Sequence, residues 1–266
     1  MIRPSVMRRT LLRLCAVFLL LIVGIAALGA WSLHRQLFSA EGRAVSLLVE
    51  LRALRVGESS YQEAEQIADK YGTVKVDSDW GSFDCTDGYF EHCQYQVVVQ
   101  KPVVSWMLMR FPYSRWPGLR YWNGTAEIFI KDGKVSGYWF SVVFRTPDGQ
   151  WRGVGAEETS LLDGRAVEAK VSDSYRIARN DLIMTSSHYP NKGYELTASV
   201  LPQATGVERQ RAWHFQLGCL TQTGGCVEIC DVQPDAWRDF YLGRGRFDVA
   251  KSGDRYAFCR DAALLK

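Results

Sequence analysis

Apolar residues are concentrated in one stretch near the N-terminus. Leu14–Leu33 are twenty consecutive residues without a charged side chain, and an α-helix of that length spans the roughly 30 Å hydrocarbon core of a bilayer. No Asp or Glu precedes Glu41, whereas the N-terminal flank carries Arg3, Arg8, Arg9 and Arg13. Because basic flanks stay in the cytoplasm, the pattern predicts a short basic cytoplasmic tail over 1–13, a transmembrane signal anchor over 14–33 and export of the rest.

A cleaved signal peptide is the alternative interpretation of this stretch. Signal peptides have apolar cores of about 7–15 residues that end at a small-residue cleavage site. The apolar run here is longer, and its one tolerable site, Ala27-Leu28-Gly29, is followed by Trp31, a residue type favoured at membrane interfaces. We therefore expect an uncleaved anchor, and either outcome leaves the remainder outside the cytoplasm.

Apolar residues at helical spacing continue beyond the membrane segment. Leu37, Leu47, Leu51 and Leu54 belong to a stripe that predicts a juxtamembrane helix or stalk over 34–57. This stripe either packs on the chain's own domain, which we favour, or pairs with another protein.

A second helix is indicated directly after this stalk. Ser60 and Glu63 have the spacing of a capping box, in which each side chain accepts a hydrogen bond from the other residue's backbone N–H. Gly72 is suited to terminate the helix that Ser60 begins.

From Thr73 onward apolar and polar residues alternate, as in half-buried strands. Asp132-Gly133 and Asp148-Gly149 predict tight turns, and Pro234 predicts the start of one short late helix. The predicted strands are 94–100, 127–130, 135–145, 150–158, 165–171, 194–201, 213–217 and 255–260. The expected fold class is α+β: an N-terminal membrane helix, two short helices, then a mostly antiparallel β-sheet domain with disulfides, the extracytoplasmic domain covering 58–266.

The cysteine count is typical of an exported protein. Six of the seven cysteines follow the membrane segment, and an even number suits disulfides in an oxidising compartment. Cys85 and Cys93 bracket a polar loop between two predicted strands, so we expect them to pair. The other four can pair in three ways: Cys219, Cys226, Cys230 and Cys259.

A metal site is the alternative for the later cysteines. Cys219, Cys226 and Cys230, with His214 upstream, would be its ligands, but their spacing differs from the C-x-x-C pairs of common zinc sites. The spacing of Cys226 and Cys230 also differs from that of thioredoxin-like redox pairs. We expect disulfides, with no metal and no cofactor.

Charge excludes one class of partner. The chain has 32 Lys and Arg against 29 Asp and Glu, and residues 1–40 supply five of the basic side chains and none of the acidic ones. The exported part is therefore close to neutral. Nucleic-acid binding, which depends on a basic surface, is not expected.

Catalytic residues are sparse. His188 lies in a hydroxyl-rich run that we interpret as a loop, and no G-x-S-x-G motif accompanies it or His214. Glu157 and Glu158 are adjacent, so on a strand they point to opposite faces and do not form a catalytic carboxylate pair. A periplasmic hydrolase using His188 or His214 remains an alternative function.

Aromatic and arginine residues are interleaved over 103–122. One interpretation makes 103–109 a buried strand with the aromatic residues in the core. The other is a partner or ligand surface centred on Trp106, Trp116 and Trp122, which would take a sugar or an apolar partner or rest on the membrane interface.

Four short segments resemble a group of uncharacterised signal-anchored bacterial envelope proteins. The first is Leu51-Arg-Ala-Leu54-Arg-Val56-Gly57-Glu-Ser59-Ser60-Tyr61, and the others surround Cys219, Cys226 and Pro234-Asp-Ala-Trp237. The resemblance covers about a quarter of the chain. It implies a helix followed by cysteine-bearing strands, and it implies no activity.

The expected function is that of a single-pass protein of the cell inner membrane with a periplasmic domain. The leading hypothesis is a non-enzymatic binding or scaffold module whose partners are the bilayer, through its helix, and an envelope protein or a glycan. The hydrolase is the second hypothesis. A redox or metal protein built on the C-terminal cysteines is the third.

Overall fold

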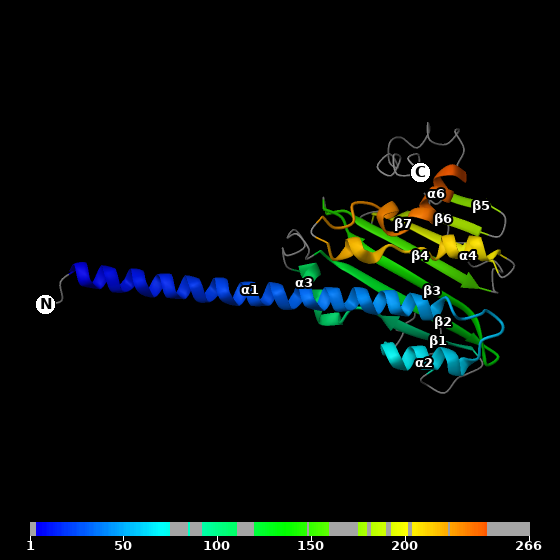
Figure 1. Ribbon diagram of the computed structural model, residues 1–266, viewed down its shortest axis with the longest axis horizontal. Coiled ribbons are helices and arrows are strands. Elements are labelled where there is room, and N and C mark those ends of the chain that lie inside the picture. The colour runs from blue at the N-terminus through cyan, green and yellow to red at the C-terminus, as the bar shows by residue number, and fades with distance from the viewer. Residues whose placement is uncertain are drawn as a thin grey trace.

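The computed structural model describes residues 4–74, 85, 92–110, 120–147, 149–159, 175–179, 182–189, 193–201, 204–222 and 224–243. Its most extended element is α1 (Pro4–Leu51), a single helix of 48 residues that reaches far beyond the sheet (Figure 1). At 1.5 Å per residue it is about 70 Å long. The predicted anchor and juxtamembrane helix are therefore one continuous helix, which Gly42 does not interrupt.

The two halves of α1 have different surroundings. Side chains of the first half, such as Phe18 and Ile25, are 66% and 70% exposed, whereas Leu37, Leu47 and Leu51 are at most 1% exposed. Within the described residues, α1 is the one helix long and apolar enough to cross a membrane. The apolar stripe of its second half packs on the chain's own domain, as favoured above.

The second predicted helix is confirmed as α2 (Tyr61–Tyr71). Ser60 N donates to Glu63 Oε2 at 2.7 Å and Glu63 N donates to Ser60 Oγ at 3.4 Å, which completes the capping box. The helix ends at Gly72, whose φ of 79° is accessible to glycine without strain. Its buried side packs Ala64, Ile67, Ala68 and Tyr71.

Seven strands form one sheet in the order β1-β2-β3-β4-β7-β6-β5. Adjacent strands are antiparallel except β4 and β7, which are parallel. The strands are β1 (His92–Val98), β2 (Trp122–Lys131), β3 (Lys134–Arg145), β4 (Trp151–Thr159), β5 (Tyr175–Arg179), β6 (Leu182–Tyr189) and β7 (Gly193–Val200). The Asp132-Gly133 turn has positive φ at both residues, as a two-residue hairpin requires.

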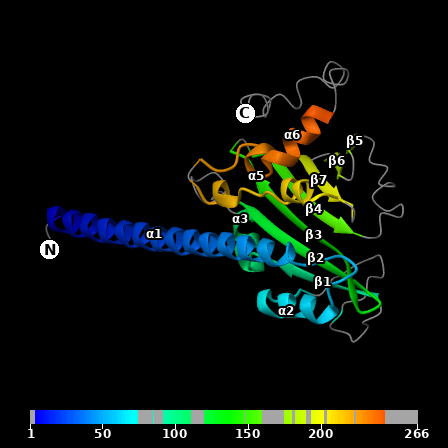
Figure 2. The ribbon, with the colours of Figure 1, turned by 45° about the vertical axis from the view of Figure 1, so that its right-hand side comes forward.

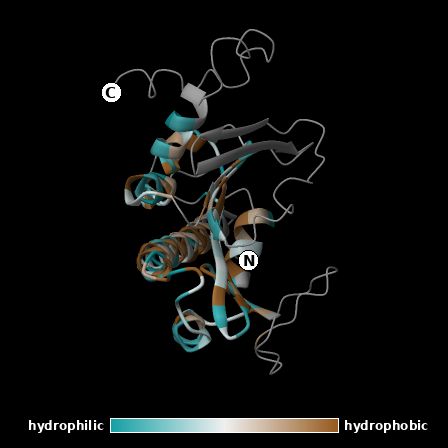
Figure 3. Ribbon diagram, turned by 90° about the vertical axis from the view of Figure 1, so that its right-hand side faces the viewer, coloured by the Kyte–Doolittle hydropathy of each residue, from teal (hydrophilic) through white to brown (hydrophobic). Residues whose placement is uncertain are grey.

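Helices cover one face of the sheet. Figures 1 and 3 show α1, α2 and the C-terminal helices α4 (Gly206–Ala212), α5 (Ile229–Val232) and α6 (Pro234–Gly243) on the same side. Alternate residues of the central strands are fully buried beneath them, including Trp122, Phe140 and Leu196. Two ring pairs attach the segment after α4: Tyr138 with Trp213 at 5.1 Å and Phe140 with Phe215 at 5.3 Å between centroids.

Two predicted strands are wrong. Residues 103–109 form α3 (Pro102–Arg110), because Pro102 suits the first turn of a helix and the buried residues Val104 and Leu108 are four apart. Residues 213–217 follow α4, which begins with an unanticipated capping box between Thr205 and Glu208 and is capped by Trp213; a short 3₁₀ turn, η4 (Leu217–Leu220), comes next. Their alternating aromatic residues contact the sheet without joining it.

One predicted loop is also wrong. The hydroxyl-rich run around His188 is β6, which pairs with β5 on one side and β7 on the other. The strands expected at 165–171 and 255–260 lie outside the described residues.

Candidate functional site

A row of polar and aromatic side chains crosses the sheet on the face opposite the apolar core. The register aligns Gln96, Glu127, Trp139, Glu157 and Ser199 on β1, β2, β3, β4 and β7, and directly opposed residues of paired strands project to the same side. Because neighbouring strands are about 4.8 Å apart, the backbones at Glu127 and Glu157 are roughly 10 Å apart. The indole of Trp139 occupies the position between them.

The residues at the two ends of this row, Gln96 and Ser199, each donate a hydrogen bond to the carboxylate next to them. Gln96 Nε2 donates to Glu127 Oε1 at 3.0 Å, and Ser199 Oγ donates to Glu157 Oε2 at 3.2 Å. Both donors are neutral, so they orient the carboxylates without neutralising them.

Two glycines of β4 create the space for this row and for a third carboxylate. A Cβ atom on Gly155 would lie 2.8 Å from Trp139 Nε1, and one on Gly153 would lie 3.1 Å from Glu195 Cγ. The indole and the Glu195 side chain therefore lie against bare backbone. Glu127, Glu157 and Glu195, with Trp139, are called the acidic sheet face below.

Burial dominates the electrostatics of the acidic sheet face. It raises the pKa of Glu127, Glu157 and Glu195, and the charge of Glu157 raises the pKa of Glu127 further. The hydrogen bonds from Gln96 and Ser199 oppose these shifts in part. Among the described Lys and Arg residues, none forms an ion pair with the three carboxylates.

On the helix-covered face, by contrast, two carboxylates form ion pairs with arginines. Glu158 accepts from Tyr138 Oη at 2.8 Å and pairs with Arg209 at 3.1 Å. Glu228 pairs with Arg152 through two hydrogen bonds. Glu157 and Glu158 do point to opposite faces, as predicted. Glu157 shares its face with Glu127, two strands away, and no adjacency in sequence indicated this.

Two of the three tryptophans singled out from the sequence are described by the structure, and they do not share a surface. Trp106 is half exposed on α3, whereas Trp122 is fully buried on the helix-covered face of β2. Trp116 lies outside the described residues. Trp139 was missed because its strand, with aromatic residues on both sides of it, has no simple alternation.

His214 does not complete a catalytic triad with the described residues. Its Nδ1 lies 2.8 Å from Asp235 Oδ2, and Arg238 also contacts that carboxylate. No hydroxyl or thiol in the described part of the chain is recorded against the other ring nitrogen of His214. His188 is on β6, and its side chain lies outside the described residues.

Five described cysteines are disulfide-bonded, whereas Cys15 of α1 is free. Cys85 pairs with Cys93, as expected, and Cys219 pairs with Cys226, which selects one of the open pairings. Cys230 is also disulfide-bonded, and Cys259 lies outside the described residues. No group of three His, Cys, Asp or Glu within the described ranges is arranged to hold a metal ion.

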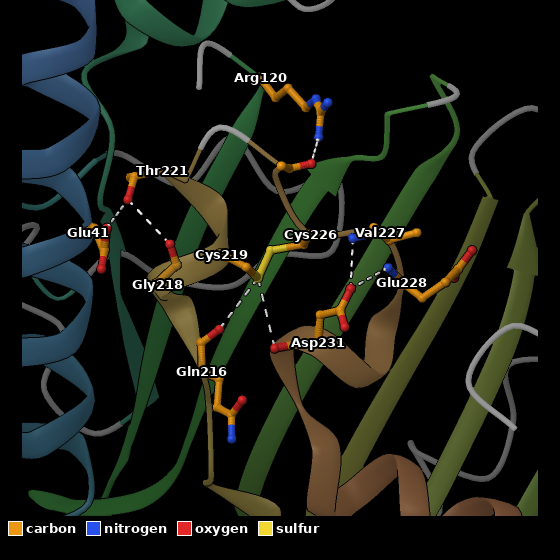
Figure 4. Close-up of a disulfide and its surroundings, with 11 residues drawn as sticks. Glu41, Arg120, Gln216, Gly218, Cys219, Thr221, Cys226, Val227, Glu228 and Asp231 are labelled. Atoms are coloured by element: carbon orange, nitrogen blue, oxygen red, sulfur yellow. Dashed lines mark hydrogen bonds between the residues drawn. A yellow bond between two sulfur atoms is a disulfide. The ribbon is translucent and has the colours of Figure 1, made fainter. Parts of the chain in front are cut away.

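The Cys219–Cys226 loop joins α1 to the sheet (Figure 4). Thr221 donates to Glu41 of α1, and Arg120, just before β2, donates to the Gly224 carbonyl. Asp231 accepts from Val227 N at 2.8 Å. This arrangement is that of a structural staple.

Comparison with known proteins gave no match: no family model, no curated protein and no solved structure matches the chain.

Proposed function

We propose that the protein is a single-pass membrane-anchored binding module whose domain works outside the cytoplasm, in the periplasm of a bacterial envelope. Three observations support this placement: the apolar first half of α1, the basic N-terminal flank and the disulfides. Basic flanks remain cytoplasmic, and disulfides persist in oxidising compartments. The inner membrane is the bilayer that a cytoplasmic tail and a periplasmic domain require.

The acidic sheet face supports a cationic ligand. Its carboxylates are partly buried and, within the described residues, carry no cationic partner, so their pKa values are raised. An ammonium or guanidinium group over the Trp139 ring, with Glu127 on one side and Glu157 on the other, would offset part of their negative charge, and the ring face would attract the same cation. We propose that the ligand is a lysine or arginine side chain of an envelope protein.

Titration of the full chain in lipid nanodiscs with a tetralysine peptide tests this proposal. We expect the Glu127→Gln/Glu157→Gln variant to lose about tenfold or more in affinity, the effect of about 1.4 kcal/mol. The matched control, Glu58→Gln/Asp69→Asn, changes the net charge equally at exposed positions of the α1–α2 connection and of α2 and should bind as the wild type does. If both variants bound the peptide equally weakly, the loss of affinity would reflect overall charge alone, and a defined site would be refuted.

A neutral glycan is the competing ligand for this face. Its binding would depend on Trp139 and would survive the two Glu→Gln changes. An oligosaccharide that binds the double variant as it binds the wild type would therefore replace the cationic ligand.

A further inference from the structure

A pocket lies between α1 and the connection from β1 to α3. Its volume is about 220 Å³, and its lining includes Arg35, Ser39 and Arg43 of α1 and Gln100 and Lys101 of the connection. On α1 these residues are four apart and so lie on one side of the helix.

The lining of this pocket is suited to an anion. It contains three basic residues, and none of its lining residues, all of which are described, is acidic. Gln100 is 2% exposed, and its Oε1 accepts from Ser105 Oγ at 3.1 Å. Its Nε2 is buried with no hydrogen-bond partner in the described part of the chain. Because an unsatisfied buried donor is unfavourable, an acceptor atom in the pocket would remove a defect of the unliganded protein.

The pocket lies at the level where the membrane segment ends. Arg35 lies two residues after Leu33, and Ser39 lies six residues after Leu33. Along the helix axis they are therefore about 3 Å and 9 Å beyond Leu33. The headgroup layer on each side of the hydrocarbon core is about 5–8 Å thick. The end of the pocket at Arg35 therefore lies within the headgroup layer, where lipid phosphates are found, and Ser39 lies just beyond it.

Helix α3 adds an apolar surface at the same level. Figures 1 and 2 show it at the end of the sheet from which α1 departs, and its residue Val104 lines the pocket together with residues of α1. Val103, Trp106 and Met109 are 68%, 50% and 51% exposed and three residues apart, so they lie along one side of the helix. Arg110 lies over the Trp106 ring at 5.9 Å. A tryptophan, apolar side chains and a basic residue on one short helix are typical of interfacial segments.

We infer that this pocket binds the phosphate of an anionic phospholipid, with Arg35, Lys101 and the Gln100 amide as donors, while the exposed side of α3 rests in the membrane interface. The inference depends on the membrane anchoring proposed above. It does not depend on the acidic sheet face. Docking of this kind would hold the domain at one orientation to the bilayer.

Native mass spectrometry of the full chain, released from nanodiscs of equal phosphatidylcholine and phosphatidylglycerol, tests the inference. We expect the wild type to retain phosphatidylglycerol preferentially. The Arg35→Gln/Lys101→Gln variant should retain about tenfold less, a difference of about 1.4 kcal/mol. Lys131→Gln/Lys134→Gln, which removes two exposed basic residues at the β2–β3 turn, is the matched control and should retain as much as the wild type.

A second variant separates binding from folding. Gln100→Glu keeps an acceptor for Ser105 but replaces the amide donor by a carboxylate oxygen, so it should abolish retention while the far-ultraviolet circular dichroism stays unchanged. Arg8, Arg9 and Arg13 of the N-terminal flank are present in every variant, so their attraction for anionic lipid cancels in the comparison.

Four outcomes would overturn the inference. Equal retention by the wild type and the Arg35→Gln/Lys101→Gln variant would remove the pocket as the binding site. Stabilisation by inorganic phosphate without lipid retention would make the ligand a soluble anion. A chain that fails to incorporate into nanodiscs would overturn the anchoring and this inference together, whereas an incorporated chain without lipid preference would overturn this inference alone.

Discussion

The ion pair between Arg152 and Glu228 offers the sharpest test of how the C-terminal segment is held on the sheet. Arg152 Nε and Nη2 donate to the two carboxylate oxygens of Glu228 at 2.8 and 3.0 Å, and the two side chains are 6% and 12% exposed. The pair joins β4 to the residue before α5, across 76 residues of sequence. Glu228→Gln retains the shape of the side chain and removes its charge.

Removal of one member of a buried ion pair costs about 3–5 kcal/mol, because the remaining charge stays desolvated opposite a neutral group. A domain of this size loses about 2–4 °C in Tm per kcal/mol, so we expect a fall of about 6–20 °C. Arg152→Met/Glu228→Leu should recover most of the loss, because replacing both charges by apolar groups is often neutral. The exposed pair Arg55–Glu58, with side chains 75% and 71% exposed, provides the matched control: Glu58→Gln should cost less than about 1 kcal/mol.

Urea unfolding of the full chain in detergent micelles, followed by tryptophan fluorescence, gives the free energy of unfolding for each variant. Arg152→Met, Glu228→Leu and the double variant Arg152→Met/Glu228→Leu together form a double-mutant cycle whose coupling energy reports the pair. A Glu228→Gln variant as stable as Glu58→Gln would refute the reasoning, since the pair would then contribute no more than a surface contact.

Two further predictions concern pH and the disulfides. Burial raises the pKa of Glu127, Glu157 and Glu195 in the folded chain. Their contribution to stability is therefore fully present below the pKa of a glutamate in the unfolded chain, about 4.3. It is lost as pH rises through the raised pKa values of the folded chain. The free energy of unfolding measured against pH should therefore fall, from pH 4 to 8, relative to a triple Glu→Gln variant; a parallel pair of curves would contradict it. Cys219→Ser/Cys226→Ser opens a loop with a sequence separation of 7 and should lower the free energy of unfolding by about 2–4 kcal/mol in the same urea assay. A change below about 0.5 kcal/mol, the level of an ordinary surface substitution, would show that Glu41, Arg120 and Asp231 hold the loop without the disulfide.

The parts of the fold that could be predicted are those that local chemistry dictates. The apolar run of Leu14–Leu33, the capping box of Ser60 and Glu63 and the Asp132-Gly133 turn each depend on residues close together in the chain. Cys85 and Cys93 pair across a short loop. Predictions that needed a partner element failed: residues 103–109 and the run around His188 have ambiguous periodicity, and their packing neighbours are distant in sequence.

The candidate sites likewise depend on contacts between distant residues, which the sequence alone does not indicate. Sequence alone predicted a membrane anchor, a nearly neutral remainder of the chain and cysteines that suit an oxidising compartment, because each of these is a sum or a short-range pattern. Only the register of five strands aligns Gln96, Glu127, Trp139, Glu157 and Ser199 in one row, and only packing brings Gln100 and Lys101 against Arg35 of α1. Burial, which raises the carboxylate pKa values and leaves the Gln100 donor unsatisfied, is a property of the packed chain, since residues far apart in sequence supply the atoms that exclude water.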